Sequence, residues 1–191
     1  MDNRTLGEKS VRAGEVIRRF TAKDGKEVIL RTPRWEDLDD LLEYINSLVD
    51  EGADIMMDQK TTREQEAEWL GRKLVLPDKG EEFSLVAEVD GKVVANSAVT
   101  KKKGRQKHVG GLGIAIREDY RDVGIGTEMM RTLIAQAGKM GLELLVLCIF
   151  STNKRAIHVY EKAGFREVGR IPRGLCKDGK YVDEITMSRE L

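Results

Sequence analysis

The sequence predicts an α/β protein, of the α+β kind, with a single sheet that mixes antiparallel and parallel strands. Two patterns indicate this class. Asp90-Gly91 and Lys177-Asp178-Gly179 each separate two strand-like segments, which is typical of antiparallel hairpins. Segment 142–150 is almost wholly apolar, which is typical of a strand buried on both faces. It comes after a segment with a helical pattern, and a strand–helix–strand order places the two strands parallel to each other. A chain of 191 residues, 40% of them apolar, is long enough for one such domain.

The first part of the chain predicts two short strands followed by two helices. The strands are expected at 15–20 and 27–31. Apolar residues at helical spacing predict a first helix from about residue 34, and a second is expected over about 62–74. The connection between these helices carries Ile55, Met56 and Met57, and is either a flexible wall for a ligand or a packed loop.

The remainder predicts the rest of the sheet and two more helices. Helical patterns cover 125–137 and 153–163, and a glycine follows each. Glycines at 110, 111 and 113 indicate a bulge or a close approach within one strand. The strands are expected at 83–89, 92–101, 109–116, 142–150, 165–171 and 181–187.

Charge and cysteine content exclude several classes of protein. Basic and acidic residues both number 33, so no net field favours nucleic acid or an anionic membrane. No apolar run approaches the roughly 20 residues of a membrane span, and residues 1–12 lack the apolar core of a secretory signal. Cys148 and Cys176 form neither a disulfide framework nor a metal-ligand spacing. We therefore expect a cytoplasmic protein without metal, nucleic-acid partner or membrane.

A glycine-rich stretch, Arg121-Asp122-Val123-Gly124-Ile125-Gly126, joins a predicted strand to a predicted helix. The first amides of a helix have no partner within it, and the helix dipole places partial positive charge there. Glycines allow the backbone to approach a ligand closely and to adopt positive φ. This stretch therefore predicts an anion site, which we expect to hold a pyrophosphate.

A second pattern lies in the helix over 153–163. Asn153 and Tyr160 are seven residues apart, about 20° short of two helical turns, so both side chains lie on one side. That side adjoins the carboxyl end of strand 142–150, where ligands gather in parallel sheets. Taken alone, Asn153 is a helix cap and Tyr160 a packing residue.

Together, Arg121-x-x-Gly124-x-Gly126 and Asn153-x-x-Ala156-Ile157-x-x-Tyr160-x-x-x-Gly164-Phe165 resemble the GNAT superfamily of N-acetyltransferases, and loosely its ribosomal-protein alanine acetyltransferases. The resemblance implies the GNAT fold: a central, mostly antiparallel sheet of six to seven strands, flanked by about four helices, with a splayed parallel pair in the middle. It covers residues 26–191 as the acetyltransferase domain. Residues 1–25 remain as an N-terminal extension, expected to be partly mobile, with room for one extra strand.

The resemblance also implies acetyl-CoA as the acyl donor. Its pantetheine arm would enter the splay and pair with the backbone of Ile114, Ala115 and Ile116. Amides beside Ile116 would serve as oxyanion donors. Tyr160 would stand near the thioester sulfur, either as general acid or as a hydrogen-bond donor while solvent supplies the proton. Further implied cofactor contacts are Asn153, the Arg121 side chain and the loop amides of Asp122, Val123, Gly124, Ile125, Gly126 and Thr127.

The general base is left open by the sequence. Some relatives carry a glutamate five residues before the cap asparagine, where this chain has Cys148, itself expected to be an inert packing thiol. The candidates that remain are a water chain or one of four side chains: Glu88, His108, Asp183 and Glu184.

The implied reaction is direct attack of a primary amine on acetyl-CoA, the amine belonging to a protein N-terminus, an amino acid or a polyamine. Two acidic stretches, within 36–43 and 50–58, could attract such a cation or simply be solvated. The alternative function is a non-catalytic acyl-CoA-binding regulatory module on the same fold. A dinucleotide-binding domain is disfavoured because Met129 stands where its third glycine belongs. A homodimer is compatible with either function.

Overall fold

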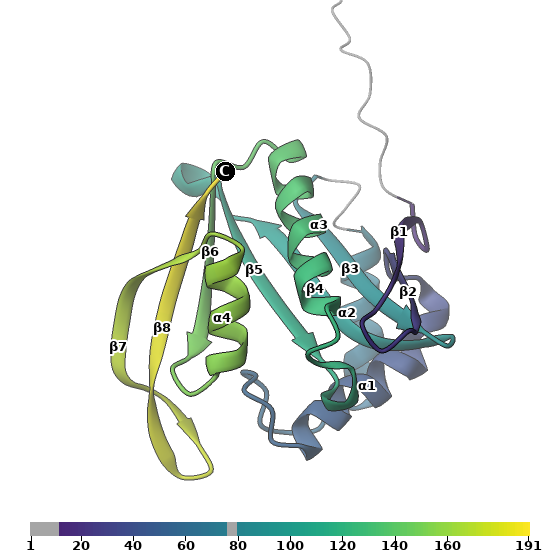
Figure 1. Ribbon diagram of the computed structural model, residues 1–191, viewed down its shortest axis with the longest axis horizontal. Helices are drawn as coiled ribbons and strands as arrows, with labels where there is room; N and C mark the ends of the chain where they lie inside the picture. Colours follow the sequence, from purple (N-terminus) through teal and green to yellow (C-terminus); the bar gives the residue numbers. More distant parts are fainter. Residues whose placement is uncertain (1–11, 76–79) are drawn as a thin grey trace, which may run out of the picture.

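The computed structural model describes residues 12–75 and 80–191 and places their strands in one eight-stranded sheet (Figure 1). The strand order is β1-β2-β3-β4-β5-β6-β8-β7. Every neighbouring pair is antiparallel except β5 and β6, which are parallel. The strands are β1 (Val16–Thr21), β2 (Glu27–Arg31), β3 (Glu82–Val89), β4 (Lys92–Lys101), β5 (Val109–Ile116), β6 (Leu144–Phe150), β7 (Arg166–Lys177) and β8 (Lys180–Glu190).

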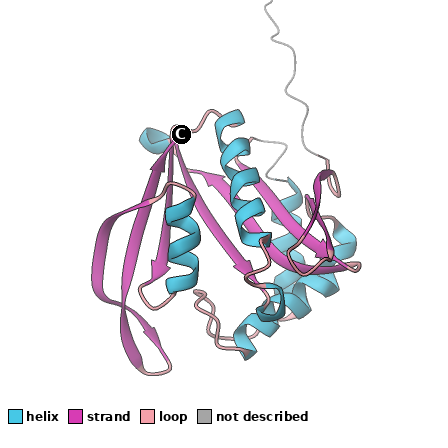
Figure 2. Cartoon of the chain, in the orientation of Figure 1, coloured by secondary structure: helices cyan, strands magenta, loops and turns pink. Residues whose placement is uncertain are grey.

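Two pairs of helices cover the sheet, one pair on each face (Figure 2). α1 (Leu38–Asp50) and α2 (Arg63–Val75) pack against Val86 and Val93, while α3 (Ile125–Lys139) and α4 (Lys154–Lys162) pack in a larger core with Leu85 and Val94. Neighbouring residues of one strand thus enter different cores, as the two-residue period of a strand requires. The mixed sheet with a central parallel pair is confirmed. The eighth strand is β1, which lies in the N-terminal extension; the first eleven residues, expected to be mobile, fall outside the described residues.

The prediction that segment 142–150 is buried on both faces is only half correct. Leu145, Leu147 and Ile149 are buried, but Cys148 is exposed. The reason is that α1 and α2 pack beneath β3, β4 and β5 and leave the far face of β6 accessible. An unbroken apolar run therefore did not require burial of both faces.

β5 and β6 pair only briefly, and this creates the site. Their parallel ladder joins 109–111 to 144–146, after which the strands diverge toward their carboxyl ends (Figure 1). Gly110 explains the close approach at the paired end, because an added Cβ would lie 2.7 Å from Leu142 Cδ1. The predicted close approach is thus present at Gly110, and the β4–β5 register runs without a bulge.

Candidate active site

The glycine loop has the geometry that its sequence predicts. Gly124 is the N-cap of α3 with φ +100°, a conformation that side-chain-bearing residues rarely adopt. A Cβ at Gly126 would stand 3.1 Å from Ile116 Cδ1, so the second glycine lets the helix start pack on β5. The unpaired first amides of α3 consequently lie beside the end of β5, where they can receive an anion.

The backbone of β5 presents an open edge at the same place. Arg117 N–H donates to the Val94 carbonyl across β4, and in an antiparallel ladder every second residue points the same way. The Ala115 backbone therefore faces β4, and its carbonyl also accepts a hydrogen bond from the Tyr44 hydroxyl at 2.9 Å. Ile114 and Ile116 point instead into the gap beyond the β5–β6 ladder. Of the three predicted contact residues, Ile114 and Ile116 can therefore offer backbone hydrogen bonds to a ligand in the gap, whereas Ala115 cannot.

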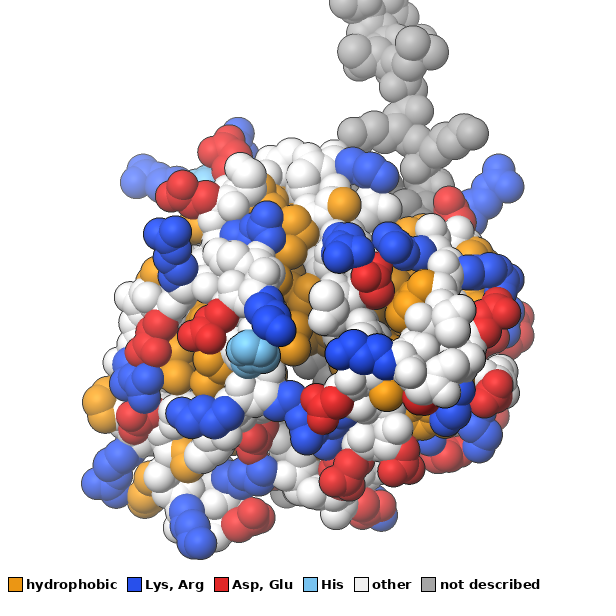
Figure 3. All heavy atoms as spheres, viewed as in Figure 1, with side chains coloured by type: hydrophobic (Ala, Val, Ile, Leu, Met, Phe, Trp, Pro, Cys, Tyr) orange, Lys and Arg blue, Asp and Glu red, His pale blue; other side chains and the backbone are white. Residues whose placement is uncertain are grey.

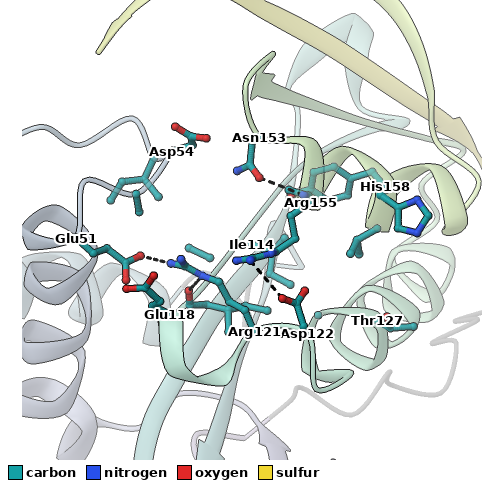
Figure 4. Close-up of a pocket in the computed structure, with 18 of the residues that line it drawn as sticks. Glu51, Asp54, Ile114, Glu118, Arg121, Asp122, Thr127, Asn153, Arg155 and His158 are labelled. Atoms are coloured by element: carbon teal, nitrogen blue, oxygen red, sulfur yellow. Dashed lines mark hydrogen bonds and ion pairs between the residues drawn. The ribbon is translucent and has the colours of Figure 1, made fainter. Parts of the chain in front are cut away.

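Arg121 is part of the wall of this gap rather than a free cation. Its Nε donates to the Ile116 carbonyl at 2.8 Å, and its guanidinium also pairs with Glu51 at the end of α1. The Ile116 carbonyl is thereby occupied, while the Ile116 N–H still faces the gap. Figure 4 shows Arg121 reaching across the site toward Glu51.

α4 brings its two predicted residues to the same gap. The Asn153 side-chain oxygen accepts the Ala156 amide at 3.1 Å, so the side chain caps the helix. Tyr160 is buried and packs against Phe165, with ring centroids 5.8 Å apart. Burial raises the pKa of the Tyr160 phenol above its ordinary value. The phenol therefore stays protonated at neutral pH and is a hydrogen-bond donor.

A cavity of about 550 Å³ joins these elements. Val123 and Ile125 are predicted to contact the cofactor through their backbone amides, and their side chains pack into the core behind the loop. The predicted residues that do line the cavity are Ile114, Ala115, Ile116, Arg121, Asp122, Gly124, Gly126, Thr127, Asn153 and Tyr160.

The cavity separates charge. Figure 4 shows Glu51, Asp54 and Glu118 on one side, and Arg155 and His158 of α4 on the other. Lys23 and Lys162 add positive charge to the lining, and Lys and Arg side chains surround a hollow on the face of α3 and α4 (Figure 3). One side thus suits a polyanion and the other a cation.

Sequence reasoning identified part of the acidic wall. Glu51 and Asp54 belong to the second acidic stretch, and both line the cavity. Glu118, from the turn η4 (Glu118–Tyr120), was missed because no pattern marks it. In the connection between α1 and α2, the Ile55 side chain lines the cavity, whereas Met56 and Met57 are exposed to solvent.

The first acidic stretch is engaged elsewhere and does not line the cavity. Asp37 forms a buried ion pair with Arg31 at 2.6 Å, and Asp40 accepts the Val93 amide at 3.0 Å. Asp39 and Glu43 make ion pairs with Arg63 and Arg117. These carboxylates fix α1 to the sheet and to α2.

The four side chains considered for the general base lie outside the cavity lining. The Glu88 carboxylate accepts a hydrogen bond from Arg31 Nε at 2.7 Å. The His108 carbonyl accepts hydrogen bonds from the amides of Glu143 and Leu144 at the amino end of β6, whereas the cavity lies at the carboxyl end. Asp183 accepts the Arg173 amide and pairs with Arg170, which together lower the pKa of its carboxyl. Glu184 pairs with Phe150 along the sheet. All four therefore lie outside the cavity wall to which Tyr160 contributes.

Cys148 is not the buried packing residue that its neighbours suggested. Its side chain is exposed, with its sulfur 3.8 Å from the Thr186 hydroxyl. Partial desolvation and the nearby Glu184 raise the pKa of this thiol, which disfavours the reactive thiolate.

Over residues 12–75 and 80–191, no group of three His, Cys, Asp or Glu could hold a metal ion. No helix in the same ranges is long and apolar enough to cross a membrane.

Several acetyltransferases are similar in sequence to this chain. The L-amino acid N-acetyltransferase of Escherichia coli is 31% identical over 107 residues, 55% of this chain and 66% of that protein. An L-methionine sulfoximine/L-methionine sulfone acetyltransferase of Pseudomonas aeruginosa is 31% identical over 78 residues, and the match spans only 45% of its length. The N-alpha-acetyltransferase of Sulfurisphaera tokodaii is 28% identical over 171 residues, 83% of this chain and 92% of that protein.

Solved structures agree with the fold. An acetyltransferase of the GNAT family from Streptococcus pneumoniae superposes with a TM-score of 0.77 at 25% identity, covering 86% of this chain and 99% of that one. A phosphinothricin acetyltransferase from Sinorhizobium meliloti, solved with AcCoA, has a TM-score of 0.76 at 20% identity over 90% of this chain and 89% of its own. The profile of the acetyltransferase (GNAT) family matches residues 46–165, which include the glycine loop, β5, β6 and α4. The chain therefore belongs to the acetyltransferase (GNAT) family.

Proposed function

We propose that this chain transfers an acetyl group from acetyl-CoA to a primary amine by direct attack of the amine on the thioester. One observation carries the proposal. A single cavity contains the positive-φ glycine loop at the start of α3, the open edge of β5 and the buried Tyr160 of α4. Between them these elements offer an anion site, backbone hydrogen bonds and a proton donor, which acetyl transfer from a CoA thioester requires.

The donor would lie along the side of the cavity formed by α3 and α4. The amides from Asp122 to Thr127 would receive the pyrophosphate, next to the positive charge of Arg155. The pantetheine arm would pair with the Ile114 backbone, and the Ile116 N–H would face the thioester carbonyl, while Ala115 is held by β4. Arg121 would act on the donor indirectly, by fixing the Ile116 carbonyl. A GNAT-fold neighbour solved with AcCoA supports this donor.

The Ile116 N–H and Tyr160 would act in the acetyl-transfer step itself. The neutral amine forms a bond to the thioester carbon, and the Ile116 N–H can stabilise the oxyanion that develops. The nitrogen, now positively charged, loses a proton to cavity water, and collapse of the intermediate breaks the carbon–sulfur bond and releases the CoA thiolate. A free tyrosine has a pKa of about 10 and a thiol about 8.5, and burial raises the pKa of Tyr160 further. Hydrogen-bond donation from Tyr160 to the leaving sulfur is thus favoured over complete proton transfer, and water supplies the proton.

The acidic side of the cavity would receive the amine. Glu118 is exposed and lines the cavity, and Glu51 and Asp54 stand on the same side (Figure 4). Glu118 attracts the ammonium form, and Asp54 can do so when the ligand takes the place of its contact with Lys177, whereas Glu51 stays paired with Arg121. The ammonium proton leaves through cavity water before attack. The acceptor would accordingly be cationic in solution.

Mass spectrometry of N-acetylated products, with parallel titration of free thiol, tests the proposal. Acetyl-CoA is mixed with amino acids, peptides and polyamines, and with the native chain or Tyr160→Phe. We expect one amine class to give product and thiol in equal amounts, and the variant to bind acetyl-CoA but to turn over more slowly. Binding of acetyl-CoA without thiol release for any amine would instead support the regulatory-module alternative.

A further inference from the structure

An ion pair lines the cavity at the end away from the glycine loop. Lys177 Nζ lies 2.5 Å from Asp54 Oδ1, and the Thr152 hydroxyl lies 3.5 Å from Asp54 Oδ2. Lys177 is the last residue of β7, and Asp54 lies in the connection between α1 and α2, so the contact joins segments 123 residues apart. Both side chains line the cavity, and Figure 4 shows Asp54 on the side opposite Thr127.

This contact restricts what can enter. A peptide N-terminus needs an open groove between the first two helices and the terminal hairpin, and the ion pair spans that route. The Asp54 side chain is 17% exposed and that of Lys177 is 31% exposed, so the pair is partly withdrawn from water. Partly buried charges attract a complementary ligand more strongly than fully solvated ones do.

The two charges differ from the other ion pairs that line the cavity. Arg121 is held at two points, by the Ile116 carbonyl and by Glu51, so it is fixed in the wall. Arg155 and Asp122 form a solvent-exposed pair beside the glycine loop, on the donor side. Lys177 by contrast has a flexible stem, and among the described residues its ammonium group contacts the Asp54 carboxylate. A ligand that carries one positive and one negative charge close together can insert between Asp54 and Lys177 and satisfy both.

We propose that Asp54 and Lys177 select a free α-amino acid as the acceptor, with Lys177 binding the α-carboxylate and Asp54 the α-ammonium group. The inference rests on the proposed acetyl transfer and specifies its substrate class. A polyamine carries no carboxylate for Lys177. The carboxylate of a peptide is separated from its reactive amine by at least one residue. Of the three acceptor classes, the α-amino acid alone carries both charges at adjacent positions.

Four acceptors that differ in this feature test the inference: an L-amino acid, its carboxamide, a dipeptide with the same first residue, and spermidine. Thiol release is measured for each with acetyl-CoA and the full chain. The native chain should use the free acid at least about tenfold better, in kcat/KM, than the carboxamide, because a charged hydrogen bond is lost. Lys177→Met should lower kcat/KM for the free acid by about 10- to 100-fold and affect the carboxamide far less, because the carboxamide has no carboxylate for Lys177 to bind.

Two neighbouring substitutions provide matched controls. Lys180, which pairs with Lys177 across the hairpin, and Asp58, in the same connection as Asp54, are exposed and do not line the cavity. Lys180→Met and Asp58→Asn should behave as the native chain does, whereas Asp54→Asn should raise KM for the free acid. Unchanged acetyl-CoA affinity in all four variants shows that the fold is retained.

Equal use of acid and carboxamide by the native chain would overturn the inference, as would better use of the dipeptide or spermidine. An equal loss for acid and carboxamide in Lys177→Met would also overturn it, since the pair would then only shape the wall. A chain that binds acetyl-CoA but releases no thiol with any acceptor refutes acetyl transfer itself, and this inference with it.

Discussion

Gly124 offers the sharpest test of how the loop is built. The residue is the N-cap of α3 with φ +100°, and a Cβ added to it would meet no atom within 4 Å. Gly124→Ala therefore introduces conformational strain without a steric clash. Left-handed backbone costs a side-chain-bearing residue about 1–2 kcal/mol, which should appear as an equal loss in the free energy of unfolding. If the loop relaxes to avoid the strain, its amides move and acetyl-CoA affinity falls instead.

Gly138, in the same helix, is the matched control. It lies within α3 without positive φ, and an added Cβ there also meets nothing within 4 Å. Gly138→Ala should stabilise the protein by about 0.5–1 kcal/mol, so the two alanine variants should differ by about 1.5–3 kcal/mol. Urea denaturation followed by circular dichroism measures both, with an unchanged m-value as the condition for comparison. Equal stability of the two variants, with unchanged acetyl-CoA affinity, would refute this reasoning.

Three further predictions follow from buried groups. Tyr160→Phe should slow thiol release by about 10- to 100-fold without changing acetyl-CoA affinity; because the pKa of Tyr160 is raised, its titration should not lower the native rate even at pH 10. Burial alone would raise the pKa of Glu82, but hydrogen bonds from Lys73 and two hydroxyls outweigh it and lower that pKa below 4.5. The stability from Glu82 is therefore present above pH 4.5 and lost as the pH falls through the lowered pKa, so Glu82→Gln should unfold with less acid dependence in that window. Gly110→Ala, with its Cβ 2.7 Å from Leu142 Cδ1, should cost about 1–3 kcal/mol in thermal or urea unfolding.

Local chemistry made the loop and the helix cap predictable. Gly124 requires positive φ, and Asn153 caps α4, as residue type and spacing indicated. The parallel β5–β6 pair also followed from the strand–helix–strand order. Each of these features depends on contacts within a few residues or on chain connectivity, and a single sequence carries that information.

Long-range partners could not be predicted in the same way. The motif predicts Arg121 as a cofactor contact, but its contacts with Glu51 and the Ile116 carbonyl could not be predicted from residue spacing. Asp37 and Asp54 both lie in acidic stretches, yet one is buried against Arg31 and the other lines the cavity with Lys177. Which carboxylate meets which cation depends on how α1 and the terminal hairpin dock on the sheet, and residue spacing does not encode that docking.

Amide hydrogen exchange with and without acetyl-CoA, resolved for individual residues by NMR, tests most directly whether the donor lies in the β5–β6 gap. We expect acetyl-CoA to slow exchange at Ile114, Ile116 and the amides from Gly124 to Thr127. The Ala115 amide, already directed at β4, should be slow in both states. Protection confined to other surfaces, or no change at Ile114 and Ile116 with acetyl-CoA bound, would contradict the proposed donor site.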